Sequence, residues 1–327
     1  MITPKVSVCC LSYNHEKYIR QCLDSIVMQQ TTFPFEVLVH DDASKDNSQQ
    51  IILEYAEKYP NIIKPILQKE NQFSKGKGIL GPFLCPKCTG KYVAFCECDD
   101  YWTDPLKLQK QVDFLETHNE YIFCCHRFTI FEENYNIYRK EYAYDLYKQG
   151  EDLEITEEIF LKVWVTQMLT TIIRTDVFLN TMQLVCDTYH TSRDVYMFYE
   201  LLQQGKGVSL NQDMGIYRWN DGGIFRGANN VTRYLSGVNV YTAIYKQHPN
   251  DILLLPKIIY NYNRLLRFTY LSSEGKQRLK DAMSYCSTGT QKIKIIMMYL
   301  IHPTLFVLPY KLFEYQWRKK CSISKPS

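Results

Sequence analysis

Residues 92–102 read "YVAFCECDDYW", a short apolar run that ends in three carboxylates. The run predicts a buried strand, and Glu97, Asp99 and Asp100 follow it within four positions. Like charges this close raise one another's pKa unless a cation joins them. Mg²⁺ or Mn²⁺ prefers oxygen ligands, and magnesium is typically bound by one or two carboxylates together with substrate phosphates. The stretch therefore predicts a divalent metal site that also binds a nucleoside diphosphate.

Two earlier segments have the same form, an apolar run followed by polar side chains. "KVSVCCL" (5–11) precedes Ser12–Asn14, and "FEVLVHD" (35–41) ends at Asp41 and Asp42. Strand-like and helix-like segments alternate here, which is typical of an α/β fold with a mostly parallel sheet covered by helices on both faces. Ligands of such sheets bind beyond the carboxyl ends of the strands. We expect the three polar clusters to share one site, although each carboxylate alone is also a common helix cap.

The segments between these strands carry local signals of their own. Ser44 is expected to cap the helix after the second strand. The glycine- and lysine-rich loop 71–78 is expected to precede a helix that ends near Gly90. Asp104 is expected to cap a further helix, with Pro105 at its first position.

Composition narrows the class of protein. The chain has 327 residues, of which 46% are apolar and 22% charged, as in an ordinary globular protein. Its net charge of +3 comes from 38 basic and 35 acidic side chains and gives no concentrated basic field, so we expect no nucleic acid partner. The 12 cysteines, several within strand-like runs, and a first strand that begins almost at Met1 favour a reducing, cytoplasmic location. "CPKC" (85–88) is also compatible with half of a zinc site.

The pattern changes after about residue 230, where helical spacing replaces strand alternation. Residues 293–317 are strongly apolar, but Lys294, His302 and two prolines keep each apolar run shorter than the roughly 20 residues that a spanning helix needs. Arg318–Lys320 follow directly. One interpretation is peripheral contact with the inner face of an anionic membrane through residues 290–320. The other is a helical cap packed on the sheet domain.

Residues 4–48, "PKVSVCCLSYNHEKYIRQCLDSIVMQQTTFPFEVLVHDDASKDNS", and 90–115, "GKYVAFCECDDYWTDPLKLQKQVDFL", resemble the family 2 glycosyltransferases of bacterial surface-polysaccharide clusters. The resemblance covers about residues 4 to 225. It implies a GT-A (Rossmann-like) domain over 1–230, with a nucleotide-binding part of about 1–126 and an acceptor-binding part of about 127–230. Residues 231–327 would form a helical C-terminal extension. The resemblance also implies a nucleotide-sugar donor, Mg²⁺ or Mn²⁺, and inversion at the anomeric carbon.

The same resemblance assigns roles in the nucleotide-binding part. Tyr13 would stack on the nucleotide base, and Asp41 would contact that base. Asp99 would lie near the ribose and the metal, and Asp100 would bind the metal and the diphosphate. The expected nucleotide-sugar contacts are Leu11, Tyr13, Asn14, Asp41, Glu97, Asp99 and Arg218, with Glu97 in place of the family's first aspartate.

In the acceptor-binding part the resemblance implies that Asp194 is the catalytic base, at the start of a helix. Its alternative role is a simple helix N-cap. Arg218, in "YRW" (217–219), would help to neutralise the leaving group. Many relatives have a histidine close after this arginine, whereas this chain has Asn220 and Asp221, and the following glycines at 222–223 would let a lid move. The expected acceptor is a hydroxyl of a saccharide, and a lipid-linked one is preferred because the basic, apolar C-terminus would hold the enzyme at the inner membrane face.

Two other classes of function remain open from the sequence. A metal-dependent nucleotidyltransferase would also cluster acids around a metal, but it normally has a glycine-rich basic loop after the first strand, where this chain has "SYNHEKY" (12–18). A non-catalytic carbohydrate-binding membrane protein would not need the complete set of acids.

Overall fold

The computed structural model of the chain describes residues 3–76, 78–188, 193–220, 229–268, 272–300 and 322–323. Asp221 and the glycines at 222–223, expected in a lid, lie outside the described residues. So does the part of the expected membrane contact from 301 to 320.

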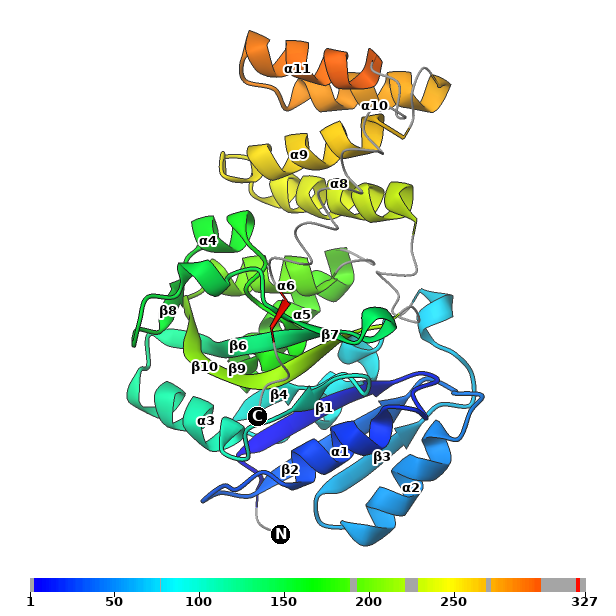
Figure 1. Cartoon of the computed structure of the whole chain (residues 1–327), viewed down its shortest axis with the longest axis vertical. Coiled ribbons are helices and arrows are strands. Elements are labelled where there is room, and N and C mark those ends of the chain that lie inside the picture. The colour runs from blue at the N-terminus through cyan, green and yellow to red at the C-terminus, as the bar shows by residue number, and fades with distance from the viewer. Residues whose placement is uncertain are drawn as a thin grey trace.

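Four parallel strands build the first half of the sheet, in the spatial order β3-β2-β1-β4 (Figure 1). They are β1 (Val6–Ser12), β2 (Phe35–Asp41), β3 (Ile63–Leu67) and β4 (Tyr92–Phe95). The central strands are apolar and almost fully buried because helices cover both of their faces. As expected, α1 (Ile19–Val27) and α2 (Ser48–Lys58) follow β1 and β2 in the chain.

The sheet continues beyond β4 with antiparallel pairs, so it is mixed rather than parallel throughout. β9 pairs antiparallel with both β4 and β6, and β7 with β6. The long β10 runs parallel to β6 and antiparallel to β5 and β8. The bounds are β5 (Tyr101–Trp102), β6 (Tyr121–Glu132), β7 (Ile137–Lys140), β8 (Leu153–Ile155), β9 (Ile172–Arg174) and β10 (Lys206–Trp219). The expected α/β class is confirmed.

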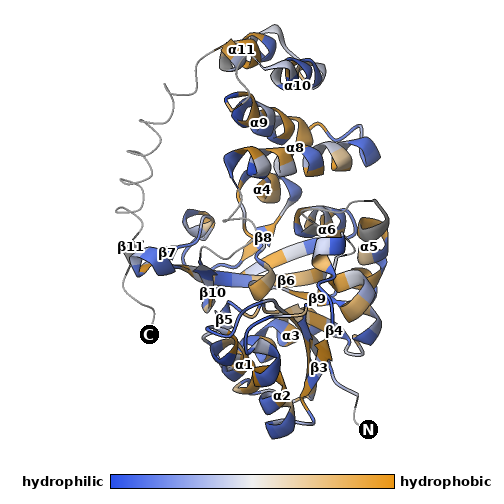
Figure 2. Ribbon diagram, turned by 90° about the vertical axis from the view of Figure 1, so that its right-hand side faces the viewer, coloured by the Kyte–Doolittle hydropathy of each residue, from blue (hydrophilic) through white to orange (hydrophobic). Residues whose placement is uncertain are grey.

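The sheet separates two apolar cores. One lies under α1, α2 and α3 (Lys107–Thr117) and contains Cys10, Leu23 and Val112. The other lies under α4 (Glu157–Lys162), α5 (Thr175–Thr188) and α6 (Arg193–Leu202), and it extends into the C-terminal helices. Figure 2 shows the apolar strands between these helix layers. Because side chains alternate along a strand, Cys9 and Cys10 of β1 belong to opposite cores.

Two local expectations were wrong, and one was met in part. α2 begins at Ser48, and Ser44 hydrogen-bonds to Asp41 instead of capping this helix. Helical turns at Leu80–Leu84 and Cys85–Lys87 follow the loop at 71–78 and end before Gly90, but they are π and 3-10 turns. α3 begins at Lys107, after Pro105, because Asp104 accepts the Leu106 N–H in a preceding turn.

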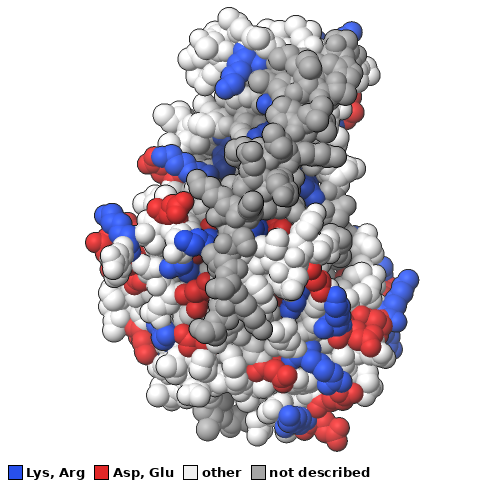
Figure 3. Space-filling view, viewed as in Figure 1, with Lys and Arg blue, Asp and Glu red and all other residues white. Residues whose placement is uncertain are grey.

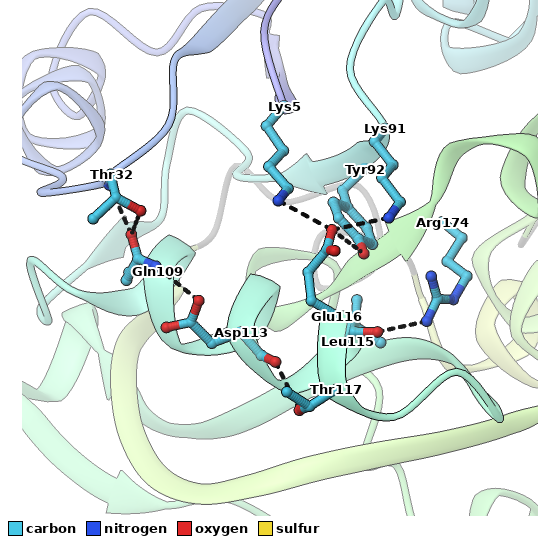
Figure 4. A network of polar contacts seen from close by, with 10 residues as sticks. All are labelled: Lys5, Thr32, Lys91, Tyr92, Gln109, Asp113, Leu115, Glu116, Thr117 and Arg174. Atoms are coloured by element: carbon cyan, nitrogen blue, oxygen red, sulfur yellow. Dashed lines mark hydrogen bonds and ion pairs between the residues drawn. The ribbon is translucent and has the colours of Figure 1, made fainter.

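A polar network fastens the amino ends of β1 and β4 to α3 (Figure 4). One carboxylate oxygen of Glu116 lies 3.1 Å from Lys5 Nζ and 3.0 Å from Lys91 Nζ, and it accepts a 2.9 Å hydrogen bond from Tyr92 Oη. The Lys91 hydrogen bond, with those of Tyr92 and Lys5, lowers the pKa of Glu116 to about 2. This end of the sheet is therefore held by charge, opposite the polar strand ends.

In the described part of the chain, four helices follow β10 and stack in a column above the sheet in Figure 1. They are α8 (Asn230–Gln247), α9 (Leu254–Leu266), α10 (Ser273–Ser284) and α11 (Gly289–Leu300). Helix side chains at 244, 254 and 258 join the core that lies under α6. The expected helical character after residue 230 is confirmed, and no helix among the described residues is long and apolar enough to cross a membrane.

The end of the chain returns to the sheet. β11 (Ser322–Ile323) pairs antiparallel with β7 at the sheet edge. On the face shown in Figure 3, basic and acidic side chains are interspersed over the sheet domain, without a field of one sign.

Candidate functional site

The acidic turn, Glu97–Asp100, lies where β4 ends beside β1. The Cys98 N–H donates to Leu11 O (2.9 Å), and the Asp100 N–H donates to Glu97 O (2.9 Å). These two bonds close the turn and attach it to the carboxyl end of β1. The predicted neighbours Leu11, Glu97, Asp99 and Asp100 are therefore brought together.

Asp100 is 1% exposed. Its Oδ1 accepts a 2.7 Å hydrogen bond from the Arg218 N–H, whereas no described residue hydrogen-bonds to its buried Oδ2. Burial, together with the charges of Asp99 and Glu97, raises the pKa of Asp100. A carboxylate with a vacant buried oxygen beside two other acids fits a hard cation, which would relieve the repulsion.

The end of β10 holds the acidic turn from the other side. Arg218 Nε donates to Asp99 O (2.8 Å), and Arg218 Nη2 donates to Gln21 Oε1 (2.7 Å). The guanidinium also lies 4.8 Å from the ring centroid of Tyr18. Arg218 thus lies at the site as expected, and its side chain hydrogen-bonds to the Asp99 carbonyl of the turn and to Gln21 of α1.

Asn220 is a site residue that the sequence reasoning left unassigned. Its Nδ2 donates to Asp99 Oδ2 (3.0 Å), two positions after Arg218 on the same strand end. The two-residue spacing between Arg218 and Asn220 could have indicated this role, because alternate residues of an extended chain face the same side. Asn220 orients the carboxylate of Asp99.

Asp194 lies in the first turn of α6, where its own N–H and that of Val195 lower its pKa less than burial raises it. Its charge reaches the acidic turn. Burial first, then the charges of Asp99 and Asp194, raise the pKa of Glu97 to about 8. Residues nearly 100 positions apart therefore face one electrostatic site. The charge of Asp194 also affects Tyr241 of α8, whose pKa is raised first by burial and then by Asp194.

The loops after β1 and β2 are joined by hydrogen bonds. The Asn14 N–H donates to Ser44 Oγ (2.8 Å), and Asn14 Oδ1 accepts from the Lys45 N–H (2.8 Å). Asp41 is fully buried, with its oxygens accepting bonds from Ser44 and Gln49. In this structure Asn14 and Asp41 therefore organise the loops.

Tyr13 is the accessible member of the β1 loop. The residue is 42% exposed, so part of it can contact a ligand. It follows the strand that carries Leu11 and lies one residue before Asn14, whose φ of 55° turns the chain. This position is compatible with the expected stacking on a base.

No group of three or more His, Cys, Asp or Glu side chains that could hold a metal ion occurs in the described part of the chain. The acidic turn thus offers two aspartates rather than a complete protein cage. Magnesium sites completed by substrate phosphates have this form.

Comparison with known proteins decides the family. The model of glycosyl transferase family 2 matches residues 7–174, which contain β1, the acidic turn and β9. The chain belongs to glycosyl transferase family 2. The resemblance noted in the sequence is therefore confirmed.

Two relatives illustrate the family match. An uncharacterized protein of Mycobacterium tuberculosis, Rv1520, is 44% identical over 131 residues, which are 39% of this chain and 36% of that protein. The putative teichuronic acid biosynthesis glycosyltransferase TuaG of Bacillus subtilis is 34% identical over 112 residues, 34% of this chain and 42% of TuaG. The chain thus matches less than half the length of these two relatives.

Two solved structures share the fold. Residues 1–349 of S. aureus TarS in complex with UDP-GlcNAc align with a TM-score of 0.57 and 18% identity, over 90% of this chain and 89% of that chain. The mannosyltransferase PcManGT from Pyrobaculum calidifontis, in complex with GDP-Man and Mn²⁺, aligns with a TM-score of 0.51 and 15% identity, over 94% and 87%. Because they cover 90% and 94% of this chain, these likenesses extend into the region after residue 230.

Proposed function

We propose that the protein is a metal-dependent, inverting glycosyltransferase that moves a sugar from a nucleotide-sugar donor to a hydroxyl of a saccharide. The observation that carries the proposal is the acidic turn at the end of β4, where buried Asp100 accepts the Arg218 N–H on Oδ1 and has no described hydrogen bond on Oδ2. Family membership supports the reaction class. The UDP-GlcNAc and GDP-Man complexes of the two structural neighbours support a nucleotide-sugar donor.

Asp99 and Asp100 would hold Mg²⁺ or Mn²⁺ at the acidic turn. When bound, the cation supplies positive charge that offsets the charge of the departing diphosphate. Hydrogen bonds orient the acidic turn before a ligand binds. Arg218 donates to the Asp99 carbonyl and to Asp100 Oδ1, and Asn220 donates to the Asp99 carboxylate. Such preorganisation means that no side chain must be reoriented during the reaction.

Asp194 is proposed as the general base that accepts the proton of the acceptor hydroxyl at a carboxylate oxygen. Burial raises its pKa, and a base is more effective when its pKa lies nearer the working pH. The charge of Asp194 raises the pKa of Glu97, which supports a sugar position between Asp194 and the acidic turn. Attack from the Asp194 side, opposite the diphosphate, would invert the anomeric centre.

The acceptor is proposed to be a lipid-linked saccharide in capsule, O-antigen or exopolysaccharide synthesis. The similarity to TuaG, described as a putative teichuronic acid biosynthesis glycosyltransferase, supports a surface polysaccharide. We also propose that the chain divides near residue 230 into a part that carries out sugar transfer and a C-terminal part that positions the enzyme at the membrane. Residues 290–320 would then contact the inner face of the cytoplasmic membrane peripherally, since α11 exposes Ile293, Met297 and Leu300 along one side.

Calorimetry with UDP and GDP, each with and without Mn²⁺, tests the donor site. We expect Mn²⁺ to strengthen binding of one nucleotide in the wild-type chain, and Asp100→Ala to remove that strengthening. Asp113→Ala, on the exposed side of α3, is the matched control and should bind like wild type. Nucleotide binding that ignores Mn²⁺ in all three proteins would refute the metal role. Release of pyrophosphate in place of nucleoside diphosphate during turnover would identify a nucleotidyltransferase instead.

A further inference from the structure

Two cysteines far apart in the chain lie in sulfur–sulfur contact. Cys9 Sγ on β1 and Cys88 Sγ, just before β4, are 3.6 Å apart. Cys9 is buried, whereas Cys88 is only partly buried, and its thiol also donates to Leu84 O at 3.4 Å. None of the ten cysteines whose side chains are described is in a disulfide.

Main-chain hydrogen bonds of the two residues after Cys88 attach this segment to Ser7 of β1. The N–H groups of Thr89 and Gly90 both donate to Ser7 Oγ, at 3.1 and 2.9 Å. A Cβ at Gly90 would come within 2.7 Å of Ser7 N, so the two chains approach as closely as glycine permits. Covalent joining of Cys9 and Cys88 therefore needs side-chain rotation and a small approach, because a disulfide has sulfurs about 2.05 Å apart.

Burial distinguishes this pair from the other close thiols. Cys22 Sγ and Cys96 Sγ are 3.7 Å apart, but both side chains are fully buried in the opposite core. A dissolved oxidant reaches a thiol only where it is exposed. Cys88 supplies that access, and Cys286, just after α10, is the other described cysteine that is partly exposed.

We propose that Cys9 and Cys88 form a thiol–disulfide site, which a small disulfide such as oxidised glutathione converts into a covalent bond between β1 and the segment before β4. The Cys88 thiolate attacks one glutathione sulfur and releases one glutathione. The Cys9 sulfur then attacks Cys88 Sγ, loses its proton to solvent and releases the second glutathione. One disulfide is consumed, one is formed, and two protein thiols become two glutathione thiols.

This site is distinct from the transferase chemistry and does not depend on the proposed donor or metal. The hydrogen bond with Cys88 and burial raise the pKa of Cys9, which leaves Cys88 as the attacking thiol. The bond would close a loop between positions 79 residues apart. A crosslink over such a loop restricts the unfolded chain and stabilises the folded one.

The test treats the reduced full chain with oxidised glutathione and maps non-reduced tryptic peptides by mass spectrometry. Trypsin separates the three candidates, since Cys88 lies in 88–91, Cys85 in 78–87 and Cys9 in 6–17. We expect 88–91 linked to 6–17, with a rise in Tm of roughly 5 °C. Cys88→Ser should lose both the link and the rise.

Controls separate this pair from its neighbours. Cys10→Ser removes the other thiol of peptide 6–17 and should keep the link, because Cys10 faces the opposite core. Cys286→Ser removes the matched half-buried thiol and should behave like wild type. Peptide 88–91 linked to 78–87, carrying glutathione alone, or unmodified after treatment would each overturn the proposal.

Discussion

Replacing Lys107 by methionine tests the burial of a charge at the start of α3. Lys107 is completely buried, its Nζ lies 4.0 Å from the ring centroid of Trp102, and no described residue hydrogen-bonds to that nitrogen. Burial lowers its pKa from 10.5 to about 7. Methionine has a similar shape without the charge and adapts to irregular cores.

The sign and size follow from linkage. Below pH 7 both states hold the proton, so the folded protein bears the full cost of the buried ammonium. From pH 7 to about 10.5 only the unfolded state holds it, and stability rises by about 1.4 kcal/mol per pH unit. Between pH 6 and pH 9 the contribution of Lys107 to the free energy of unfolding should thus increase by about 3 kcal/mol. The advantage of Lys107→Met over wild type should shrink by that amount.

Urea unfolding followed by tryptophan fluorescence at pH 6 and pH 9 measures this difference. Subtracting wild type from variant cancels the other titrating groups. Lys110→Met is the control on the same helix: Lys110 is paired with Asp104 at 2.6 Å and partly exposed, so its effect should not change with pH. A Lys107→Met effect that is equal at both pH values would show that the ammonium is paired or hydrated, against our reasoning.

Three further outcomes are expected. Asp194→Asn should lower the transfer rate by about 100-fold or more while nucleotide binding persists, because general-base catalysis typically contributes 10²–10⁴-fold. Initial rates would measure the loss of transfer, and calorimetry would measure the retained nucleotide binding. Asn220→Ala removes one hydrogen bond from the acidic turn and should weaken Mn²⁺-dependent nucleotide binding by about fivefold, whereas unchanged affinity would dismiss its positioning role. Gly207→Ala places a Cβ 2.1 Å from a ring atom of Phe123 and should destabilise by about 1–3 kcal/mol in urea unfolding, with Gly289→Ala, which meets nothing within 4 Å, as the comparison.

The sequence predicted the parts of the fold that depend on local pattern. The apolar runs at β1, β2 and β4 each end in polar residues, and parallel pairing then brings those ends together. The pattern did not predict the antiparallel half, because several of its pairs join residues far apart in the sequence, such as Tyr92 with Arg174 and Trp102 with Gly215. Ser44 was misassigned since a serine hydroxyl serves a helix end or a neighbouring carboxylate equally well.

For the candidate site, the sequence predicted which residues take part but not which hydrogen bonds they make. Asp99, Asp100 and Asp194 were named from motifs, and the structure groups their charges with Glu97. The motif could not show that Arg218 binds the Asp99 carbonyl, because that contact depends on where β10 ends beside the turn.

The pairing of β11 with β7 changes how the C-terminal region should be dissected. Both flanks of residues 301–321 are secured to the folded protein, at Leu300 of α11 and at Ser322 of β11. A truncation at residue 300 would uncover the hydrogen-bonding edge of β7, and exposed strand edges promote aggregation. If such a truncated protein no longer sedimented with vesicles, the result could not distinguish lost lipid affinity from a damaged sheet. Charge reversal at positions 318–320, with the terminal strand left in place, separates the two effects.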